Sequence, residues 1–229
     1  MTARAWFVTG TDTGVGKTLV SVALLHALAA RHARVVGMKP VAAGAERDAG
    51  GRWSNDDVQA LRAASTIVVD AALDNPVLLP DPVSPHIAAA RAGRAIDIAA
   101  IARACAALRA QADAVVVEGA GGFRVPLGAA LAGADLAAAL GLPLILVVGL
   151  RLGCLNHALL TAESIERRGL KLAGWVASRV DAAMPEQSAN LELLRARLPA
   201  PCVGDVPWLA PPDARRAAAC LDVDALERA

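Results

Sequence analysis

The stretch VTGTDTGVGKT, Val8–Thr18, decides the fold of this chain. It follows a short apolar run and precedes the alanine- and leucine-rich segment Lys17–Arg31, so it joins a predicted strand to a predicted helix. This is the context that the phosphate-binding pattern G-x-x-x-x-G-K-[ST] requires. The fit has one irregularity. Counting back from Gly16, the first glycine is expected at Thr11 but stands one place earlier, at Gly10.

The residue types in this loop suit the binding of a nucleotide. Gly10, Gly14 and Gly16 allow backbone N–H groups to turn towards an anion, and the helix dipole adds to the attraction. Lys17 would reach the β- and γ-phosphates, and the Thr18 hydroxyl would bind Mg²⁺. The alternative is a plain strand-to-helix turn with a surface lysine. Gly-Lys-Thr at such a junction favours the nucleotide site.

The rest of the chain repeats short apolar runs between longer alanine- and leucine-rich segments. VVVEG, LPLILVVGL and LAGWVAS are examples of the apolar runs. The alternation predicts an α/β fold with a mostly parallel sheet of about seven strands and helices on both faces, in one domain over 1–229. In such a sheet ligands bind at the carboxyl ends of the strands.

The composition narrows the class of protein. Hydrophobic residues make up 55% of the 229 residues but aromatic residues only 3%, so alanine, valine and leucine must build the core. A net charge of +1 gives no reason to expect nucleic-acid or membrane binding. The chain has no signal-like start and no apolar run of about 18 residues. The four scattered cysteines have no metal or disulfide spacing, so we expect a cytoplasmic protein with reduced thiols.

Three acidic residues are candidates for a metal site. Glu118 ends an apolar run and is therefore unlike a solvated surface charge. Asp56 and Asp57 open a predicted helix, but Asn55 or Asp56 could simply cap it, and spacing alone does not decide. Mg²⁺ prefers such hard oxygen ligands and usually takes one or two carboxylates from a protein.

Lys39 is a second charge in an unexpected place. It ends the apolar run VVGMKP and is followed by Pro40. Lys17 and Lys39, at the ends of strands predicted to be adjacent, would attract more negative charge than a triphosphate carries. This indicates an anionic co-substrate beside the γ-phosphate, unless Lys39 only faces water at a strand end.

The motifs, in their order, resemble the dethiobiotin synthetase family. The resemblance covers nearly the whole chain and rests on VTGTDTGVGKT, GMKPVAAG, SPHIAA, VVVEGAGG, LGCLNHALLT, LAGWVAS and GDVPWL. It implies a phosphate loop with the same extra residue, and an ATP- and Mg²⁺-dependent ring closure in biotin biosynthesis. One amine of 7,8-diaminononanoate captures CO₂ as a carbamate, ATP phosphorylates it to a carbamic-phosphoric anhydride, and the second amine closes the ring.

The resemblance also assigns roles to residues. It implies catalytic roles for Lys39, Lys17 and Thr13, and metal binding by Thr18, Asp57 and Glu118. The nucleotide-binding residues that it implies are Gly14, Val15, Gly16, Lys17, Thr18, Leu19, Asp57, Glu118, Gly119, Ala120, Gly121, Ser178, Arg179, Pro207, Trp208 and Leu209. Ser178 stands where the family has an asparagine that reads adenine.

The same resemblance implies a homodimer with the site at the interface. The substrate carboxylate would rest on a helix N-terminus of the partner subunit. The substrate-binding residues that it implies are Ala43, Ser84, Gly153, Cys154, Leu155 and Asn156. From the residues alone, Asn156 could be no more than the cap of the following helix.

A second class of proteins with this fold is an alternative. Partition and membrane-cycling ATPases are switches, and their loop carries a signature lysine that would fall at position 12. This chain has Asp12 there, and its last residues, CLDVDALERA, do not form a long, basic amphipathic segment. The residues therefore favour a synthetase over a switch.

Overall fold

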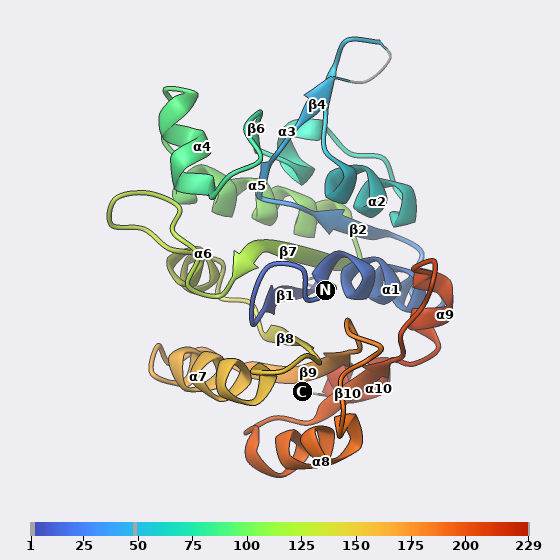
Figure 1. The fold of residues 1–229 in the computed structure, drawn as a ribbon. Helices are drawn as coiled ribbons and strands as arrows, with labels where there is room; N and C mark the ends of the chain where they lie inside the picture. The colour runs from blue at the N-terminus through green and yellow to red at the C-terminus, as the bar shows by residue number, and fades with distance from the viewer. Residues whose placement is uncertain (1–2, 48–49, 229) are drawn as a thin grey trace.

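The computed structural model describes residues 3–47 and 50–228. Its main sheet has six strands, all parallel, in the order β10-β9-β8-β1-β7-β2 (Figure 1). The strands are β1 (Arg4–Gly10), β2 (Val35–Met38), β7 (Ala114–Gly122), β8 (Leu144–Gly149), β9 (Leu172–Ser178) and β10 (Cys202–Val206). The predicted α/β class with a parallel central sheet is confirmed.

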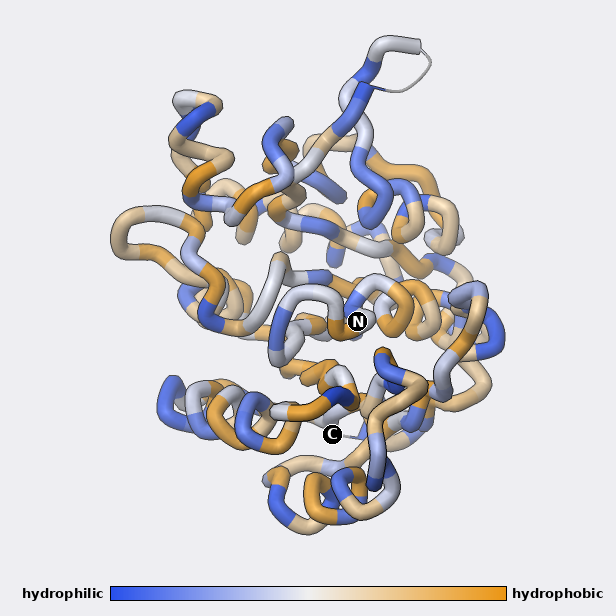
Figure 2. Tube along the Cα trace, in the orientation of Figure 1, coloured by the Kyte–Doolittle hydropathy of each residue, from blue (hydrophilic) through white to orange (hydrophobic). Residues whose placement is uncertain are grey.

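Helices cover both faces of this sheet. One face carries α1 (Lys17–Ala29), α2 (Asp56–Ala64), α9 (Ala214–Ala218) and α10 (Val223–Arg228), and the other carries α5 (Ile98–Gln111), α6 (Gly133–Leu140), α7 (Cys154–Glu166) and α8 (Gln187–Arg197). Along β8, Ile145 packs on the α1 side and Leu146 on the α7 side, because successive strand residues face opposite ways. A strand buried on both faces reads as one continuous apolar run. Figure 2 shows the contrast with α7, along which hydrophobic and hydrophilic residues alternate.

The main sheet has six strands rather than about seven, and shorter strands lie apart from it. β2 ends at Met38, because Pro40 has no N–H group to continue the ladder. The chain resumes as β3 (Val41–Ala43), which pairs with β6 (Val77–Leu79) in a separate small sheet. The remaining elements are the hairpin of β4 (Glu46–Arg47) and β5 (Trp53–Ser54), and the helices α3 (Ala71–Asp74) and α4 (Pro85–Arg91).

The strand order corrects one expectation. β1 and β2 are not neighbours, because β7 lies between them and pairs with both. One strand, β7, therefore separates the strand before Lys17 from the strand before Lys39. Glu118 lies on this intervening strand, in register with Val8 of β1. The apolar pattern marks each strand but carries no information on which strands pair, so it could not show this arrangement.

Two helix starts settle points that the sequence left open. Asn55 caps α2, and its side chain accepts a hydrogen bond from the Val58 N–H at 3.4 Å. α7 begins at Cys154 after Gly153, whose φ of 95° lies in the left-handed region, so Asn156 stands in the first turn and is not the cap.

All four cysteines are free. Among the helices of residues 3–47 and 50–228, none combines the length and apolar character needed to cross a bilayer.

Candidate active site

The phosphate loop has the geometry that its sequence predicts. β1 ends at Gly10 and α1 begins at Lys17, so the loop leads directly into a helix N-terminus. Gly16 has φ +87°, and a Cβ at this position would lie 2.5 Å from Ser178 Oγ, so only glycine fits. Lys17 Nζ folds back onto the loop and donates a hydrogen bond to the Asp12 carbonyl at 3.0 Å. The lysine and the first N–H groups of α1 thus meet at the carboxyl end of β1.

A cluster of charged and hydroxyl groups lies beside this loop. Thr18 Oγ1 is 2.8 Å from Asp57 Oδ1 and 3.0 Å from Glu118 Oε1. Lys39 Nζ is 2.6 Å from Asp57 Oδ2 and 2.5 Å from Glu118 Oε1. The structure therefore brings together Lys39 and the three residues expected to bind the metal. Asp57, rather than the exposed Asp56, faces this cluster.

Glu118 is the most unusual member of the cluster. Its side chain is fully buried, and its Oε2 has no hydrogen-bond partner among the described residues. An ionised carboxylate oxygen without a partner is costly to bury, so a cation bound at this atom would be stabilising. Glu118, Asp57 and Thr18 offer two carboxylates and a hydroxyl, which are the hard oxygen donors that Mg²⁺ prefers. The donor set fits a magnesium ion.

The two lysines differ in their electrostatics. Burial lowers the pKa of Lys17 to about 8, although the charge of Glu118 opposes this shift. Burial also acts to lower the pKa of Lys39, but the carboxylates of Glu118 and Asp57 outweigh it and raise the pKa above its usual range. Burial acts to raise the pKa of Asp57, and the Lys39 ammonium outweighs it and lowers the pKa. Two lysines thus balance two carboxylates, so a bound triphosphate would need a further cation.

A cavity of about 670 Å³ joins this cluster to the segment after β10. Its volume is in the range of small-molecule sites. Fifteen of the residues predicted to catalyse the reaction or to bind nucleotide or metal line it: Thr13, Gly14, Gly16, Lys17, Thr18, Leu19, Lys39, Asp57, Glu118, Gly121, Ser178, Arg179, Pro207, Trp208 and Leu209. The other lining residues are Val180, Ala210, Pro211 and Pro212, which the sequence reasoning missed. The proline-rich run PWLAPP after the last strand was the available signal.

Other predicted residues do not line this cavity. Val15 is buried against Gly149, and Gly119 and Ala120 line a much smaller adjacent hollow. The residues expected to bind the diamine substrate do not line the cavity of about 670 Å³ either. They are Ala43, Ser84, Gly153, Cys154, Leu155 and Asn156. Ser84 caps α4, and its Oγ lies 3.0 Å from His86 Nδ1. Within one copy of the chain, the structure therefore assembles the nucleotide end of the predicted site and not the diamine end.

Two arginines near the loop make contacts that sequence reasoning did not anticipate. Arg179 lines the cavity, but its guanidinium is bound by both oxygens of Asp205, at 3.0 and 2.9 Å, and by Gln187 Oε1 at 3.1 Å. Arg151 Nη2 lies 2.5 Å from Asp12 Oδ2 and so ties the phosphate loop to the loop after β8. Each guanidinium is directed at a carboxylate of the protein.

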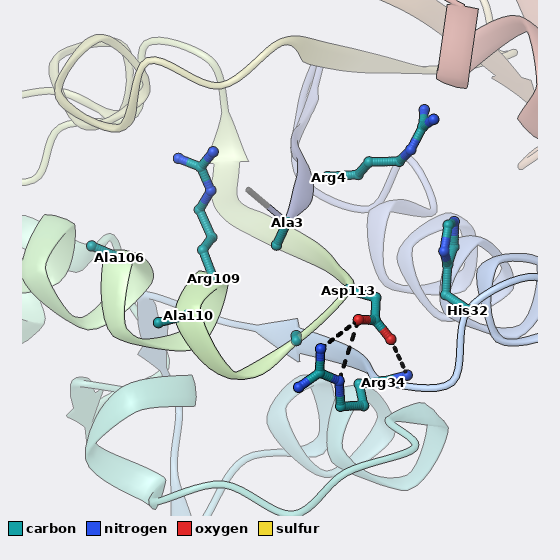
Figure 3. Close-up of a pocket in the computed structure, with 9 residues that line it drawn as sticks. Ala3, Arg4, His32, Arg34, Ala106, Arg109, Ala110 and Asp113 are labelled. Carbon is teal, nitrogen blue, oxygen red and sulfur yellow. Dashed lines mark hydrogen bonds and ion pairs between the residues drawn. The ribbon is translucent and has the colours of Figure 1, made fainter. Parts of the chain in front are cut away.

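A second cavity, of about 880 Å³, lies at the opposite ends of the strands (Figure 3). Its charged lining residues include Arg34 and Asp113, and Asp113 accepts hydrogen bonds from the Arg34 backbone at 2.9 Å and from its guanidinium at 2.6 and 3.2 Å. Arg4, which also lines it, begins β1, so this hollow is at the amino ends of the strands. Ligands of parallel sheets bind at the carboxyl ends of the strands, where the cavity of about 670 Å³ lies.

Comparisons with known proteins agree on the family. A family model described as an AAA domain matches residues 4–216. The chain is 58% identical over 220 residues to the ATP-dependent dethiobiotin synthetase BioD of Aromatoleum aromaticum, covering 95% of this chain and 96% of that protein. It is 56% identical over 217 residues to the protein of the same name from Ralstonia nicotianae, covering 95% and 94%.

A comparison of structures agrees on the fold. A chain of the MinC:MinD cell division protein complex from Aquifex aeolicus matches with a TM-score of 0.60 and 17% identity, covering 99% of this chain and 95% of that one. At this identity the likeness shows the fold alone.

Proposed function

The chain belongs to the ATP-dependent dethiobiotin synthetase family, and we propose that it closes the ureido ring of dethiobiotin from 7,8-diaminononanoate, CO₂ and ATP. The observation that carries this proposal is the buried cluster in which Lys39 and Thr18 contact Glu118 and Asp57 beside the phosphate loop. The reaction belongs to biotin biosynthesis. We place it in the cytoplasm, where ATP is available, and assign it to one domain over 1–229; cell fractionation tests the location.

The chemistry needs the charges that this site holds. One amine of the substrate captures CO₂ and loses a proton to form a carbamate. A carbamate oxygen then attacks the γ-phosphorus of ATP and ADP leaves. The second amine attacks the carbonyl carbon of the anhydride and loses a proton, and the C–O bond to the phosphoryl group breaks to release phosphate. Because the carbamate and the γ-phosphoryl group are both anionic, cations must bring them together.

Lys17 and Lys39 are the cationic side chains beside the phosphate loop that we assign to this chemistry. Lys17 opens α1 beside the loop that would hold the phosphates, and we assign it to the charge on the β- and γ-phosphates. Lys39, whose pKa is raised by Glu118 and Asp57 against the effect of burial, would hold the carbamate next to the γ-phosphate. Thr13 lines the same cavity, and its hydroxyl would donate to the phosphoryl oxygens. The protein chiefly positions reactants and neutralises charge.

We propose Mg²⁺ as the cation that the site still needs. Thr18, Asp57 and Glu118 would hold it, and the unpartnered Oε2 of Glu118 supports this assignment. When bound, the ion supplies positive charge to the phosphate oxygens of ATP.

Changing Asp57 to Asn should raise the Mg²⁺ concentration needed for half-maximal activity by about tenfold or more, since a lost ligand weakens metal affinity to at least the extent of a lost outer-shell partner. Asp56→Asn is the matched control, because Asp56 opens the same helix but is exposed. The measurement is initial rate against Mg²⁺ at saturating ATP. If Asp56→Asn raises the requirement and Asp57→Asn does not, the ligand assignment is wrong.

The segment after β10 would hold the base of ATP. Pro207, Trp208 and Leu209 line the cavity with Ser178, which is the last residue of β9 and is 2% exposed. Serine offers one hydroxyl, whereas asparagine offers a donor and an acceptor that can read adenine together. The lost hydrogen bond corresponds to about 1 kcal/mol, or a few-fold to tenfold in preference.

We therefore expect Ser178→Asn to increase the preference for ATP over CTP and GTP by about a few-fold to tenfold. Ser178 packs against Gly16 of the phosphate loop, so the Kd for ATP is measured as well, to show whether the larger side chain disturbs the triphosphate site. The measurement is competition between nucleotides at fixed diamine and bicarbonate. Strict selectivity for ATP in the unmodified protein would show instead that the backbone of the Pro207–Leu209 segment reads the base.

We propose that the diamine site is completed by a second copy of the chain. The first turn of α7 has N–H groups without intrahelical acceptors, which suit the substrate carboxylate, but Gly153–Asn156 do not line the cavity of their own chain. Leu152 beside this turn and Leu160 on α7 are exposed apolar residues that a homodimer would cover. A monomer mass in solution at assay concentration would contradict this arrangement.

The experiment that tests the function is phosphate release with each substrate omitted in turn. A synthetase releases phosphate only with ATP, diaminononanoate and bicarbonate together, and dethiobiotin forms in equal amount. A partition-type switch would hydrolyse ATP without the diamine. Asp12 is bound to Arg151 and the Thr13 N–H, so it does not replace the signature lysine of those switches.

A further inference from the structure

Lys39 lies at a break in the backbone ladder. β2 ends at Met38 and β3 begins at Val41, so the peptide groups of Lys39 belong to neither strand. Its N–H instead donates to the Asp74 carbonyl at 2.8 Å, and its carbonyl accepts from Asn75 Nδ2 at 2.7 Å. Both backbone groups of Lys39 are therefore held by two consecutive residues from the end of α3.

Asp74 and Asn75 are buried polar residues outside the cavity, with exposures of 5% and 8%. Arg62 binds both carboxylate oxygens of Asp74, with Nε to Oδ2 at 2.7 Å and Nη2 to Oδ1 at 2.6 Å. Arg62 lies on α2, the helix that carries Asp57. Asp74 and Asn75 thus hold the backbone of Lys39, and Asp74 also binds the helix that carries Asp57, the carboxylate partner of Lys39.

We propose that Arg62, Asp74 and Asn75 are positioning residues that set Lys39 against Asp57 and Glu118 in the catalytic cluster. This inference rests on the proposed function. The Lys39 side chain is buried and its Nζ is held by Glu118 and Asp57, so a shift of the Lys39 backbone would displace Nζ relative to both carboxylates. Displacement by about 1 Å can lower the rate about 100-fold when a charge must meet a reacting group.

Asn75 is the part of this network that is easiest to test. Its amide donates to the Lys39 carbonyl at 2.7 Å and to the Val77 carbonyl at 3.3 Å. Aspartate has the same shape but, when ionised, has no donor for either carbonyl. Asn75→Asp therefore changes hydrogen-bonding character without changing size, and Asn75→Ala removes the contact altogether.

The alternative is that these residues only stabilise α3. Asp70 provides the matched control, because its side chain caps α3 by accepting from the Ala72 N–H at 2.9 Å and has no hydrogen bond to Lys39 among the described residues. Asp70→Ala should lower the melting temperature and leave kcat near the wild-type value.

The test measures kcat, the Kd for ATP and the melting temperature of the full-length chain and its variants. We expect Asn75→Ala and Asn75→Asp to lower kcat by about tenfold or more while the Kd for ATP changes by less than about twofold. Adding Asn75→Ala to Lys39→Ala should lower the residual kcat no further, because residues that act through one another are not additive.

Wild-type kcat in folded Asn75→Ala, or an equal further loss in the Lys39→Ala background, would overturn the inference. If both Asn75 variants fail to fold, Arg62→Lys keeps the charge but loses the two-point contact with Asp74, and the same two outcomes decide. Failure of the wild-type chain to make dethiobiotin would instead overturn the proposed function, and it is seen before any variant is compared.

Discussion

Replacing Lys39 with alanine should lower kcat by about 100- to 1,000-fold, the loss expected when a charge-stabilising group is removed from a buried site. The Lys39 ammonium is buried and within hydrogen-bond distance of Glu118 and Asp57, which hold it in the charged form. It would act on charge that develops as the carbamate approaches the γ-phosphate. The KM for ATP should change much less than kcat, because Lys17 and the phosphate loop would bind the triphosphate in the variant as in the wild type.

Lys171→Ala is the matched control for this substitution, since Lys171 is exposed and outside the cavity. Circular dichroism and the melting temperature show whether each variant is folded, which matters because Glu118 loses a partner in Lys39→Ala. Turnover of folded Lys39→Ala within about threefold of wild type would remove Lys39 from the mechanism, since loss of a transition-state contact must lower kcat. Lys39 would then be only a buried structural charge.

Lys17→Ala should reduce kcat/KM for ATP by about 100- to 1,000-fold or more, because a loop lysine contacts phosphates in both the ground and the transition state. In the free protein burial lowers its pKa to about 8, so at neutral pH Lys17 is mostly protonated and ready to meet an anion. Unlike Lys39→Ala, this change should also weaken the binding of ATP itself. Equilibrium binding of a non-hydrolysable ATP analogue separates the two effects.

Lys17→Arg keeps the charge and serves as the comparison. Lys17 Nζ reaches the Asp12 carbonyl at 3.0 Å inside the loop, and a guanidinium is larger and planar, so we expect only partial recovery. Unchanged analogue binding and turnover in Lys17→Ala would mean that the Val8–Thr18 segment is a turn and not a phosphate-binding loop.

Local chemistry made part of this site predictable. Glycines followed by Lys17 and Thr18 at a strand-to-helix junction specify both the loop and the start of α1, because each residue acts within a few positions of itself. Glu118 stood out because the residues before it in its strand are apolar, and the structure buries it completely. The choice between Asp56 and Asp57 could not be made from spacing, since it depends on the rotation of α2 about its axis relative to Thr18.

Other features depend on contacts between distant segments. The place of β7 between β1 and β2 was unpredictable, because strands buried on both faces have similar apolar runs and no pairing signal. The hydrogen bond from Asn75 to the Lys39 carbonyl joins residues 36 positions apart, and the Asn-Pro pair there resembles an ordinary turn. Membership of the family was predicted from whole motifs, and the comparisons confirm it.

The most direct test of the mechanism follows oxygen from CO₂ into phosphate. If a carbamate oxygen attacks ATP in the cavity beside Lys17, Lys39 and Glu118, that oxygen leaves with phosphate when the ring closes. In a single turnover with diaminononanoate, ATP and ¹⁸O-labelled CO₂, read before exchange with water, the released phosphate should carry one labelled oxygen and dethiobiotin should form in equal amount. Unlabelled phosphate, or phosphate released without the diamine, would contradict the account.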